Sequence, residues 1–224
     1  MPRRRKVAGH SFFAILSQML AKALDWMFPS KCALCGIVGC PSICDACRDG
    51  FRRLDRSINL ATTPLDYRVA IFHHELRAAQ AVRRLKYSRV TSLASPLADF
   101  VKGAYDELGL DEVDAVVPVP IHWTRRTLRG FNQSELLSRA LPAEKVHPEL
   151  LLRTRRTRPQ VGLDRSKRQI NLLGAFRASD QVAGRSILLV DDVTTSGFTA
   201  EHCAQALKDK GASRVGLLTL TGEI

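Results

Sequence analysis

The sequence has few aromatic residues and no long apolar run. Phe, Trp and Tyr make up 6% of its 224 residues, which weakens any function based only on stacking bases against aromatic rings. No stretch reaches the roughly 18 consecutive apolar residues of a membrane-spanning helix, so no membrane span is predicted. The Gly-Lys-Ser/Thr ending of a Walker loop is absent. With 45% hydrophobic and 25% charged residues, the whole chain is neither disordered nor collagen-like.

A clear export signal is also missing. Basic residues 3–6 precede an apolar stretch, but Ser17, Gln18 and Lys22 interrupt it and no small-residue cleavage site follows. A cytoplasmic location is therefore expected. Apolar side chains at helical spacing predict an amphipathic helix over about residues 12–27. This helix either docks onto the rest of the protein or forms a basic anchor at a membrane surface.

The net charge of +12 is concentrated in two parts of the chain. Residues 3–6 carry +4, and residues 123–168 hold 12 basic and 4 acidic side chains, while the remainder is balanced. This distribution argues against a uniformly basic packaging protein. Localised positive charge instead predicts an anionic partner such as phosphate, nucleic acid or an acidic membrane surface.

Four of the six cysteines form two Cys-x-x-Cys pairs separated by eight residues. They are Cys32, Cys35, Cys44 and Cys47. Two such pairs complete a tetrahedral four-thiolate shell with no open position, which predicts structural Zn²⁺. The alternatives are two disulfides, which require an oxidising compartment, and a redox dithiol, which usually uses one pair. Cys40 suits the pairing less well, and Cys203 is expected to be a small core residue.

Downstream of the cysteines, predicted strands alternate with predicted helices. The strands are expected at residues 67–73, 115–119, 186–190 and 214–220, and the helices at 76–86, 90–108, 134–141 and 199–210. This alternation predicts an α/β fold with a parallel sheet flanked by helices, preceded by a small N-terminal zinc ribbon. The expected domains are residues 1–56, with the helix and zinc module, and residues 57–224. Residues 57–66 are a linker or short edge strand, and the Arg-rich residues 151–173 are expected to form a long loop that acts as a lid.

The most informative run is residues 187–199. An apolar strand ends in two carboxylates, and a loop rich in Thr, Ser and Gly then opens a helix. Because open parallel sheets bind ligands at the carboxyl ends of their strands, the loop N–H groups and the helix N-terminus predict an anion site. The candidate residues are Asp191, Asp192, Thr194, Thr195, Ser196, Gly197, Phe198 and Thr199. A ribose 5-phosphate fits this arrangement, whereas the alternative is a helix start with acids placed for capping.

This run resembles the PRPP (phosphoribosyl pyrophosphate) motif of the type I phosphoribosyltransferase family. The resemblance implies that Asp191 and Asp192 hold the ribose hydroxyls, that residues 195–199 bind the 5-phosphate, and that Mg²⁺ accompanies PRPP. Some members carry an acid in the loop as a base near the nucleophile. Thr195 stands at the corresponding place here, so that proton acceptor is missing.

A broader resemblance, to the ComF (ComFC) family of competence-associated proteins, covers nearly the whole chain. Its marks follow the cysteine pairs in order: Leu85-Lys86-Tyr87, Pro118-Val119-Pro120, Arg129-Gly130-Phe131-Asn132-Gln133, Gln160 with Arg168 and Asn171, Gly174-Ala175-Phe176, and the PRPP motif. The resemblance implies a role in DNA uptake and natural competence. It also implies single-stranded DNA and proteins of the competence machinery as partners.

Several basic residues are candidates for binding pyrophosphate. The loop expected after Pro120 carries Arg125, Arg126 and Arg129, and guanidinium groups form bidentate hydrogen bonds with phosphates. The alternative is a solvated charged loop. Further candidates are Arg165 and Arg168 in the expected lid, and Lys86 through the family resemblance alone. Asn132 and Gln133 either cap a helix or contact a ligand.

Two functions remain open at this point. The first is an enzyme in which a nucleophile displaces pyrophosphate from PRPP, with catalysis by positioning and by charge on the leaving group. The second is a catalytically inactive protein that keeps the PRPP site and acts in DNA uptake as a single-stranded DNA-binding or scaffold component. The acceptor nucleophile is not specified by any residue set in the sequence.

Overall fold

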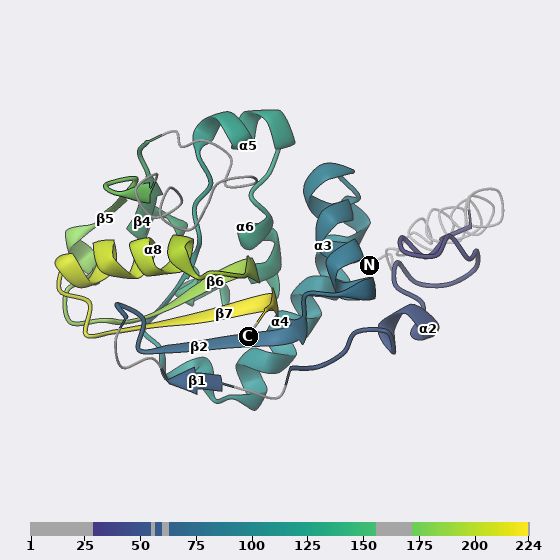
Figure 1. Ribbon diagram of the computed structural model, residues 1–224, viewed down its shortest axis with the longest axis horizontal. Helices are drawn as coiled ribbons and strands as arrows, with labels where there is room; N and C mark the ends of the chain where they lie inside the picture. The colour runs from purple at the N-terminus through teal and green to yellow at the C-terminus, as the bar shows by residue number, and fades with distance from the viewer. Residues whose placement is uncertain (1–28, 55–56, 60–62, 156–171, 224) are drawn as a thin grey trace, which may run out of the picture.

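A five-stranded, mainly parallel sheet forms the centre of the protein. The computed structural model describes residues 29–54, 57–59, 63–155 and 172–223. The strands are β1 (Ser57–Asn59), β2 (Tyr67–His73), β3 (Ala115–Pro118), β6 (Ser186–Thr194) and β7 (Arg214–Gly222), in the order β1-β2-β7-β6-β3. All neighbouring pairs are parallel except β1 and β2. The carboxyl ends of the four parallel strands therefore meet at one edge of the sheet (Figure 1).

Helices cover both faces of this sheet. One face packs against α3 (Leu76–Tyr87), α4 (Ala94–Glu107) and α6 (Gln133–Leu137). The other packs against α8 (Phe198–Asp209) and a two-stranded antiparallel sheet of β4 (Leu151–Arg153) and β5 (Phe176–Ala178). Along β6, Leu188 and Val190 join the first core, and Ile187 and Leu189 join the second. A parallel sheet buried on both faces confirms the predicted α/β class.

Two short α-helices and six short 3-10 helices complete the described residues. The α-helices are α2 (Asp45–Arg48) and α5 (Trp123–Arg129). The 3-10 helices are η1 (Thr91–Leu93), η2 (Leu110–Glu112), η3 (Ser138–Ala140), η4 (Ala143–Lys145), η5 (Pro148–Leu150) and η6 (Asp180–Val182). Across the described ranges, none of the helices has the length and apolar character needed to cross a bilayer.

Most expected elements are present, with small differences at their ends. Residues 90–108 form η1 followed by α4, residues 134–141 are covered by α6 and η3, and the strand expected at 186–190 continues to Thr194. Residues 57–66 were expected to be a linker or a short edge strand, and residues 57–59 form an edge strand. The helix expected at 12–27 lies outside the described residues, and the domain boundary after residue 56 stays a prediction.

One expected loop is wrong, and a second differs from the expectation at its start. The segment after Pro120 forms α5, because the buried His122 caps it by accepting a hydrogen bond from the Thr124 backbone N–H. The loop expected at 151–173 begins instead with β4, since Leu151 is fully buried and its strand pairs with β5 about 25 residues further along the chain. Residues 156–171 of that segment lie outside the described part of the chain.

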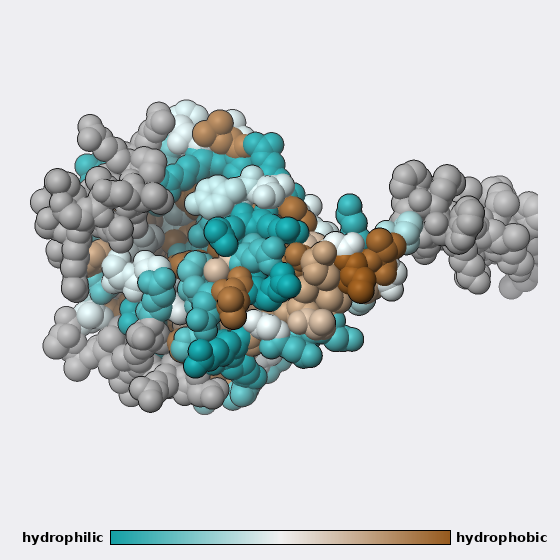
Figure 2. Space-filling model, turned by 45° about the vertical axis from the view of Figure 1, so that its right-hand side comes forward, coloured by the Kyte–Doolittle hydropathy of each residue, from teal (hydrophilic) through white to brown (hydrophobic). Residues whose placement is uncertain are grey.

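The cysteine module packs against the core of the sheet domain. Leu34, Ile43 and Phe51 belong to the same buried cluster as the inner faces of α3 and α4. Two side chains of α3 also reach the module, since Gln80 Nε2 donates to the Leu34 carbonyl at 3.3 Å and Arg84 Nη1 donates to a carbonyl of the same turn. Figure 2 shows a hydrophobic surface where the module joins the rest of the molecule.

Candidate functional site

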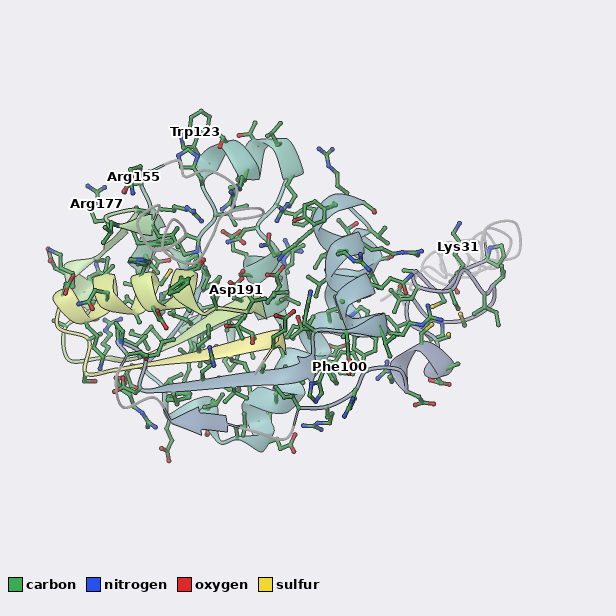
Figure 3. All side chains as sticks on the ribbon, viewed as in Figure 1. Lys31, Phe100, Trp123, Arg155, Arg177 and Asp191 are labelled. Carbon is green, nitrogen blue, oxygen red and sulfur yellow. The ribbon has the colours of Figure 1, made fainter. Side chains whose placement is uncertain are left out.

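An open cleft of about 860 Å³ lies where β3 and β6 end. Its basic lining residues are Lys86, Arg89, Arg125, Arg129 and Arg153, and its acidic lining residues are Asp191, Asp192 and Glu223. The two adjacent acids therefore sit in a cleft in which positive charge predominates. Figure 3 shows Asp191 inside the molecule, between β6 and the neighbouring helices, whereas Trp123 projects outward from α5.

The two acids of β6 point to opposite faces of the sheet. They lie within the strand rather than after it, and successive side chains of a strand alternate between faces. Asp191 accepts hydrogen bonds from the Ser134 hydroxyl at 2.8 Å and from the Asp192 backbone N–H at 2.9 Å. Asp192 instead faces α3, where its carboxylate meets Lys86. Each acid therefore has its own environment, although both line the cleft.

Lys86 and Asp192 form a largely buried ion pair. The Lys86 ammonium lies 2.9 Å from Asp192 Oδ2, and the two side chains are 19% and 3% exposed. The contact is short, but its angle does not make a hydrogen bond to Oδ2. Burial lowers the pKa of Lys86, but the charges of Asp192 and Asp191 outweigh it and raise that pKa above its ordinary value. Lys86 therefore stays charged and neutralises part of the acidic pair.

Asp191 has an unusual protonation equilibrium. Burial, and then the charge of Asp192, raise the pKa of Asp191 to about 7. Lys86 and the Ser134 hydroxyl act in the opposite direction, but they do not outweigh these two effects. At neutral pH the carboxyl group therefore exchanges between the acid and the carboxylate. In the neutral state it can donate a hydrogen bond, and in the ionised state it can accept two from adjacent hydroxyls.

A smaller pocket of about 60 Å³ opens beside the cleft, under the loop between β6 and α8. Asp191, Thr195 and Thr199 line both spaces. The N-cap of α8 is Gly197, whose φ of 77° lies in the left-handed region and which has no side chain to cap the first-turn N–H groups. Thr194 is 4% exposed and lines this pocket, and its buried hydroxyl has no hydrogen-bond partner among the described residues. These features suit a small anion or hydroxyl ligand at the N-terminus of α8.

The remaining predicted loop residues have different surroundings. Ser196 is partly exposed at the rim of the small pocket, whereas the Phe198 side chain is buried in the core beneath α8. Phe198 can therefore offer a ligand only its backbone. Thr195, which stands where some family members carry an acid, is exposed on the loop and faces the open cleft.

The structure separates the predicted basic residues into three groups. Arg125 and Arg129 line the cleft with Lys86, whereas Arg126 pairs with Glu135 at 2.6 Å and does not line it. Arg165 and Arg168 lie outside the described residues. The two polar residues at the start of α6 also differ. Asn132 caps the helix by accepting from the Ser134 backbone N–H. Gln133 lines the cleft and accepts a hydrogen bond from Arg129.

Sequence reasoning missed several residues in and around the cleft. Ser134 had no signal, because a hydroxyl on a short helix is indistinguishable from a surface serine until its contact with Asp191 is known. Arg153 belongs to the segment that was expected to be a loop, and Glu223 lies just beyond β7. Tyr87 was within the quoted Leu85-Lys86-Tyr87 motif but was given no role. In the structure it is 70% exposed on the cleft wall, and the Arg129 guanidinium lies 5.7 Å from its ring centre.

The four predicted cysteine ligands come together in a second site. The sulfur atoms of Cys32, Cys35, Cys44 and Cys47 all lie within 4.8 Å of one another. The sulfurs of Cys35 and Cys44 are 3.6 Å apart, close to the roughly 3.8 Å edge of a tetrahedron built on 2.3 Å zinc–sulfur bonds. Cys40 is not part of this group and instead donates to the Ile37 carbonyl at 3.2 Å. The donor set is therefore a metal-binding constellation of the kind that zinc occupies.

The surroundings of the clustered thiols shift their pKa values in opposite directions. Burial opposes the Cys32 thiolate, but backbone N–H groups of Cys44, Cys35 and Leu34 outweigh it and lower the pKa of Cys32 to about 6. Burial and the neighbouring thiols raise the pKa of Cys47 to about 12. Without a cation, the four thiols therefore cannot all ionise, and a divalent cation removes this conflict.

Comparisons with known proteins identify the family. Residues 129–223 match a family model described as phosphoribosyl transferase domain. DNA utilization protein YhgH of Escherichia coli strain K12 is 39% identical over 142 residues, covering 60% of this chain and 62% of that protein. Competence protein F of Haemophilus influenzae is 30% identical over 160 residues, covering 67% and 70%. Competence protein ComFC of Bacillus subtilis is 24% identical over 191 residues, covering 84% and 76%.

The chain thus spans about three fifths of the length of YhgH and more than two thirds of the other two relatives. The matched domain contains β6, the following loop and α8, which are the elements that carry the predicted PRPP motif. The parallel sheet flanked by helices has the type I phosphoribosyltransferase-like fold that the resemblance implied. Together these findings show that the chain belongs to the ComF family of competence-associated proteins.

Proposed function

We propose that the protein binds PRPP, or a related ribose 5-phosphate, at the carboxyl edge of its sheet. The hydroxyls of the ribose lie on Asp191 and Asp192, and the 5-phosphate lies in the loop of residues 194–199. The observation that carries this proposal is the small pocket beside the two acids, which residues 194–199 line and which opens at the N-terminus of α8. Simple helix capping does not account for it, because the N-cap of α8 is a glycine without a capping side chain.

The rest of the cleft suits the pyrophosphate group of PRPP. Arg125 and Arg129 line it from α5, and guanidinium groups match the geometry of phosphate oxygens. Mg²⁺ would enter on the oxygens of the ligand and supply charge neutralisation at the pyrophosphate. Lys86 neutralises Asp192, so that the acids repel an incoming anion less. Displacement of pyrophosphate by a nucleophile would then depend on orientation and on stabilisation of the leaving charge.

In the cysteine module, we propose that the resident metal is Zn²⁺ and that it is structural. Four thiolates complete the shell and leave no position for a substrate. The module also packs on α3 and α4 rather than on the cleft. The metal therefore holds the fold of the module and takes no part in the chemistry of the phosphate site.

Adding PRPP with Mg²⁺ is expected to raise the melting temperature of the protein. At a ligand concentration 100 times Kd, binding stabilises the folded state by about 2.7 kcal/mol, which corresponds to roughly 5–11 °C in a chain of this size. The double variant Asp191→Ala/Asp192→Ala should lose the response. The matched control is Asp99→Ala/Asp106→Ala on α4, outside the cleft lining, which should respond like the wild type.

Equal responses from wild type and the Asp191→Ala/Asp192→Ala protein would refute the site. Ribose 5-phosphate alone should give a smaller shift, since the pyrophosphate contacts are missing. A screen of bases and amines in the presence of PRPP, with pyrophosphate release as the readout, would identify the acceptor. Release of pyrophosphate with no added acceptor would indicate hydrolysis.

A second candidate function is binding of single-stranded DNA in the uptake process, as a scaffold or alongside other competence proteins. It is favoured by the exposed rings of Trp123 and Tyr87, which are 67% and 70% exposed among the arginines of α5 and the cleft. Exposed rings beside positive charge are the usual platform for unpaired bases.

Trp123→Ala is expected to weaken binding of a fluorescent oligothymidylate about tenfold or more, because stacking contributes roughly 1–3 kcal/mol per base. Affinity should also fall steeply with salt. Fluorescence anisotropy measures both effects, and Leu128→Ala, at an exposed apolar position of the same helix, is the control. Undiminished binding by Trp123→Ala would exclude this helix as the DNA platform.

A further inference from the structure

Within the described part of the chain, Arg68 is a partly buried cation without a counter-ion. It lies near the start of β2, in a strand whose other residues are mostly buried. Its Nε atom is buried and has no hydrogen-bond partner. Among the residues that the structure describes, no carboxylate forms an ion pair with it. An unpaired guanidinium inside a sheet is unfavourable for stability, which points to a use that the ligand-free fold does not satisfy.

The position of Arg68 places its charge against the loop that precedes α8. Arg68 is in register with Leu217 of β7, so both side chains emerge on the sheet face that α8 covers. Leu217 forms part of the lining of the small pocket. A Cβ atom added to Gly197 would lie 3.1 Å from Arg68 Nη1 and 3.6 Å from Glu201 Oε1. The guanidinium therefore lies directly behind the loop, and a side chain at position 197 would displace it.

The loop itself carries no positive charge. Residues 194–199 are Thr, Thr, Ser, Gly, Phe and Thr. Asp191 lines the pocket, and the Glu201 carboxylate lies close to Gly197. Backbone N–H groups and hydroxyls bind an anion well, but a phosphate monoester carries nearly two negative charges at neutral pH. An adjacent cation is what allows a site with acidic neighbours to prefer such an ion.

We propose that Arg68 supplies the positive charge of the 5-phosphate subsite and makes the protein selective for phosphorylated over unphosphorylated ribose. This inference rests on the proposed function, because it assigns a role within the same site. Arg68 acts through its charge behind Gly197 and is a positioning and specificity residue rather than a catalytic one. Lysine at position 68 should therefore preserve much of the effect, whereas a neutral side chain of similar length should not.

The test measures binding of ribose 5-phosphate and of ribose by calorimetry to wild type, Arg68→Met and Arg68→Lys. Arg68→Met is expected to bind ribose 5-phosphate about 10- to 100-fold more weakly, with any affinity for ribose unchanged. Arg68→Lys should stay closer to wild type than to Arg68→Met. Arg177→Met, at an exposed position on β5, is the matched control and should bind as the wild type does.

The stability of the unliganded variants distinguishes a binding role from a structural one. Removing an unpaired cation should leave the melting temperature of Arg68→Met unchanged or higher. If wild type fails to bind either PRPP or ribose 5-phosphate, the proposed function fails and this inference with it. If wild type binds ribose 5-phosphate and Arg68→Met binds equally well, only the role of Arg68 is overturned. A lower melting temperature with unchanged affinity would likewise assign Arg68 to the fold instead.

Discussion

Replacing Cys47 with serine is expected to release the metal and unfold the segment around residues 30–50. Structural zinc contributes roughly 10–16 kcal/mol of apparent binding free energy in zinc-finger peptides, more than any other single interaction described above. Cys47 is 2% exposed and one of four clustered sulfurs. Its loss leaves three ligands and a gap in the buried cluster that also holds Leu34 and Ile43. Zinc content and limited proteolysis of residues 30–50 measure the result.

Cys40→Ser provides the matched control for Cys47→Ser. The two substitutions are chemically identical and fall in the same module, but the sulfur of Cys40 lies outside the cluster. Cys40→Ser should retain about one zinc per chain and resist protease as the wild type does. The four-thiolate assignment would be wrong if Cys47→Ser kept its metal while Cys40→Ser lost it. Treatment of the wild type with a strong chelator should reproduce the protease sensitivity of Cys47→Ser.

Replacing Lys86 with methionine is expected to destabilise the free protein by about 3–5 kcal/mol at neutral pH, the usual effect of breaking a buried ion pair. The substitution leaves Asp191 and Asp192 without their neutralising cation in a strand that is otherwise buried. Urea unfolding at pH 7 measures the change. Lys102→Met is the control, because its pair with Asp106 is solvent-exposed and such pairs contribute only about 0.5 kcal/mol.

The double variant Lys86→Met/Asp192→Asn separates the ion pair from simple packing. Removing both charges should recover most of the lost stability, so the two single effects should not add and the coupling should exceed about 1 kcal/mol. Additive effects, or a Lys86→Met protein no less stable than Lys102→Met, would contradict the description of Lys86 as the cation of the acidic pair. Unfolding is measured in the absence of ligand, because PRPP with Mg²⁺ would bring additional charges into the cleft.

The order and type of the central elements could be predicted because their patterns are local. The fully apolar run at 187–190 and the alternation of strands with helices are visible in the sequence and are enough for the α/β class. The cysteine site was equally accessible, because two Cys-x-x-Cys pairs have few other uses. By contrast, β4 and β5 form through pairing across about 25 residues, and α5 depends on the buried cap of His122. Neither the long-range pairing nor the cap produces a periodic pattern of apolar residues in the sequence.

For the candidate site, the sequence predicts several residues that line the cleft but not their partners. The PRPP motif named both acids, but the pleat that sends Asp191 toward Ser134 and Asp192 toward Lys86 is a property of the folded strand. The family resemblance predicts that Lys86 binds pyrophosphate, whereas the structure shows it in an ion pair with Asp192. Arg68 did have a signal, since a lone basic residue in an apolar strand is unusual. Its place beside Gly197 follows only from the register of β2 with β7.

Helix α3 belongs to both sites of the protein. Its middle turns hold the cysteine module through Gln80 and Arg84, and its last turn carries Lys86. One rigid element therefore joins metal occupancy to the electrostatics of the cleft. The two binding events are then thermodynamically linked. If metal binding changes the affinity for an anionic sugar by some factor, binding of the sugar changes the affinity for the metal by the same factor. A shortage of zinc would then change the affinity of the cleft for its ligand, although Lys86 lies more than 30 residues from the cysteines in sequence.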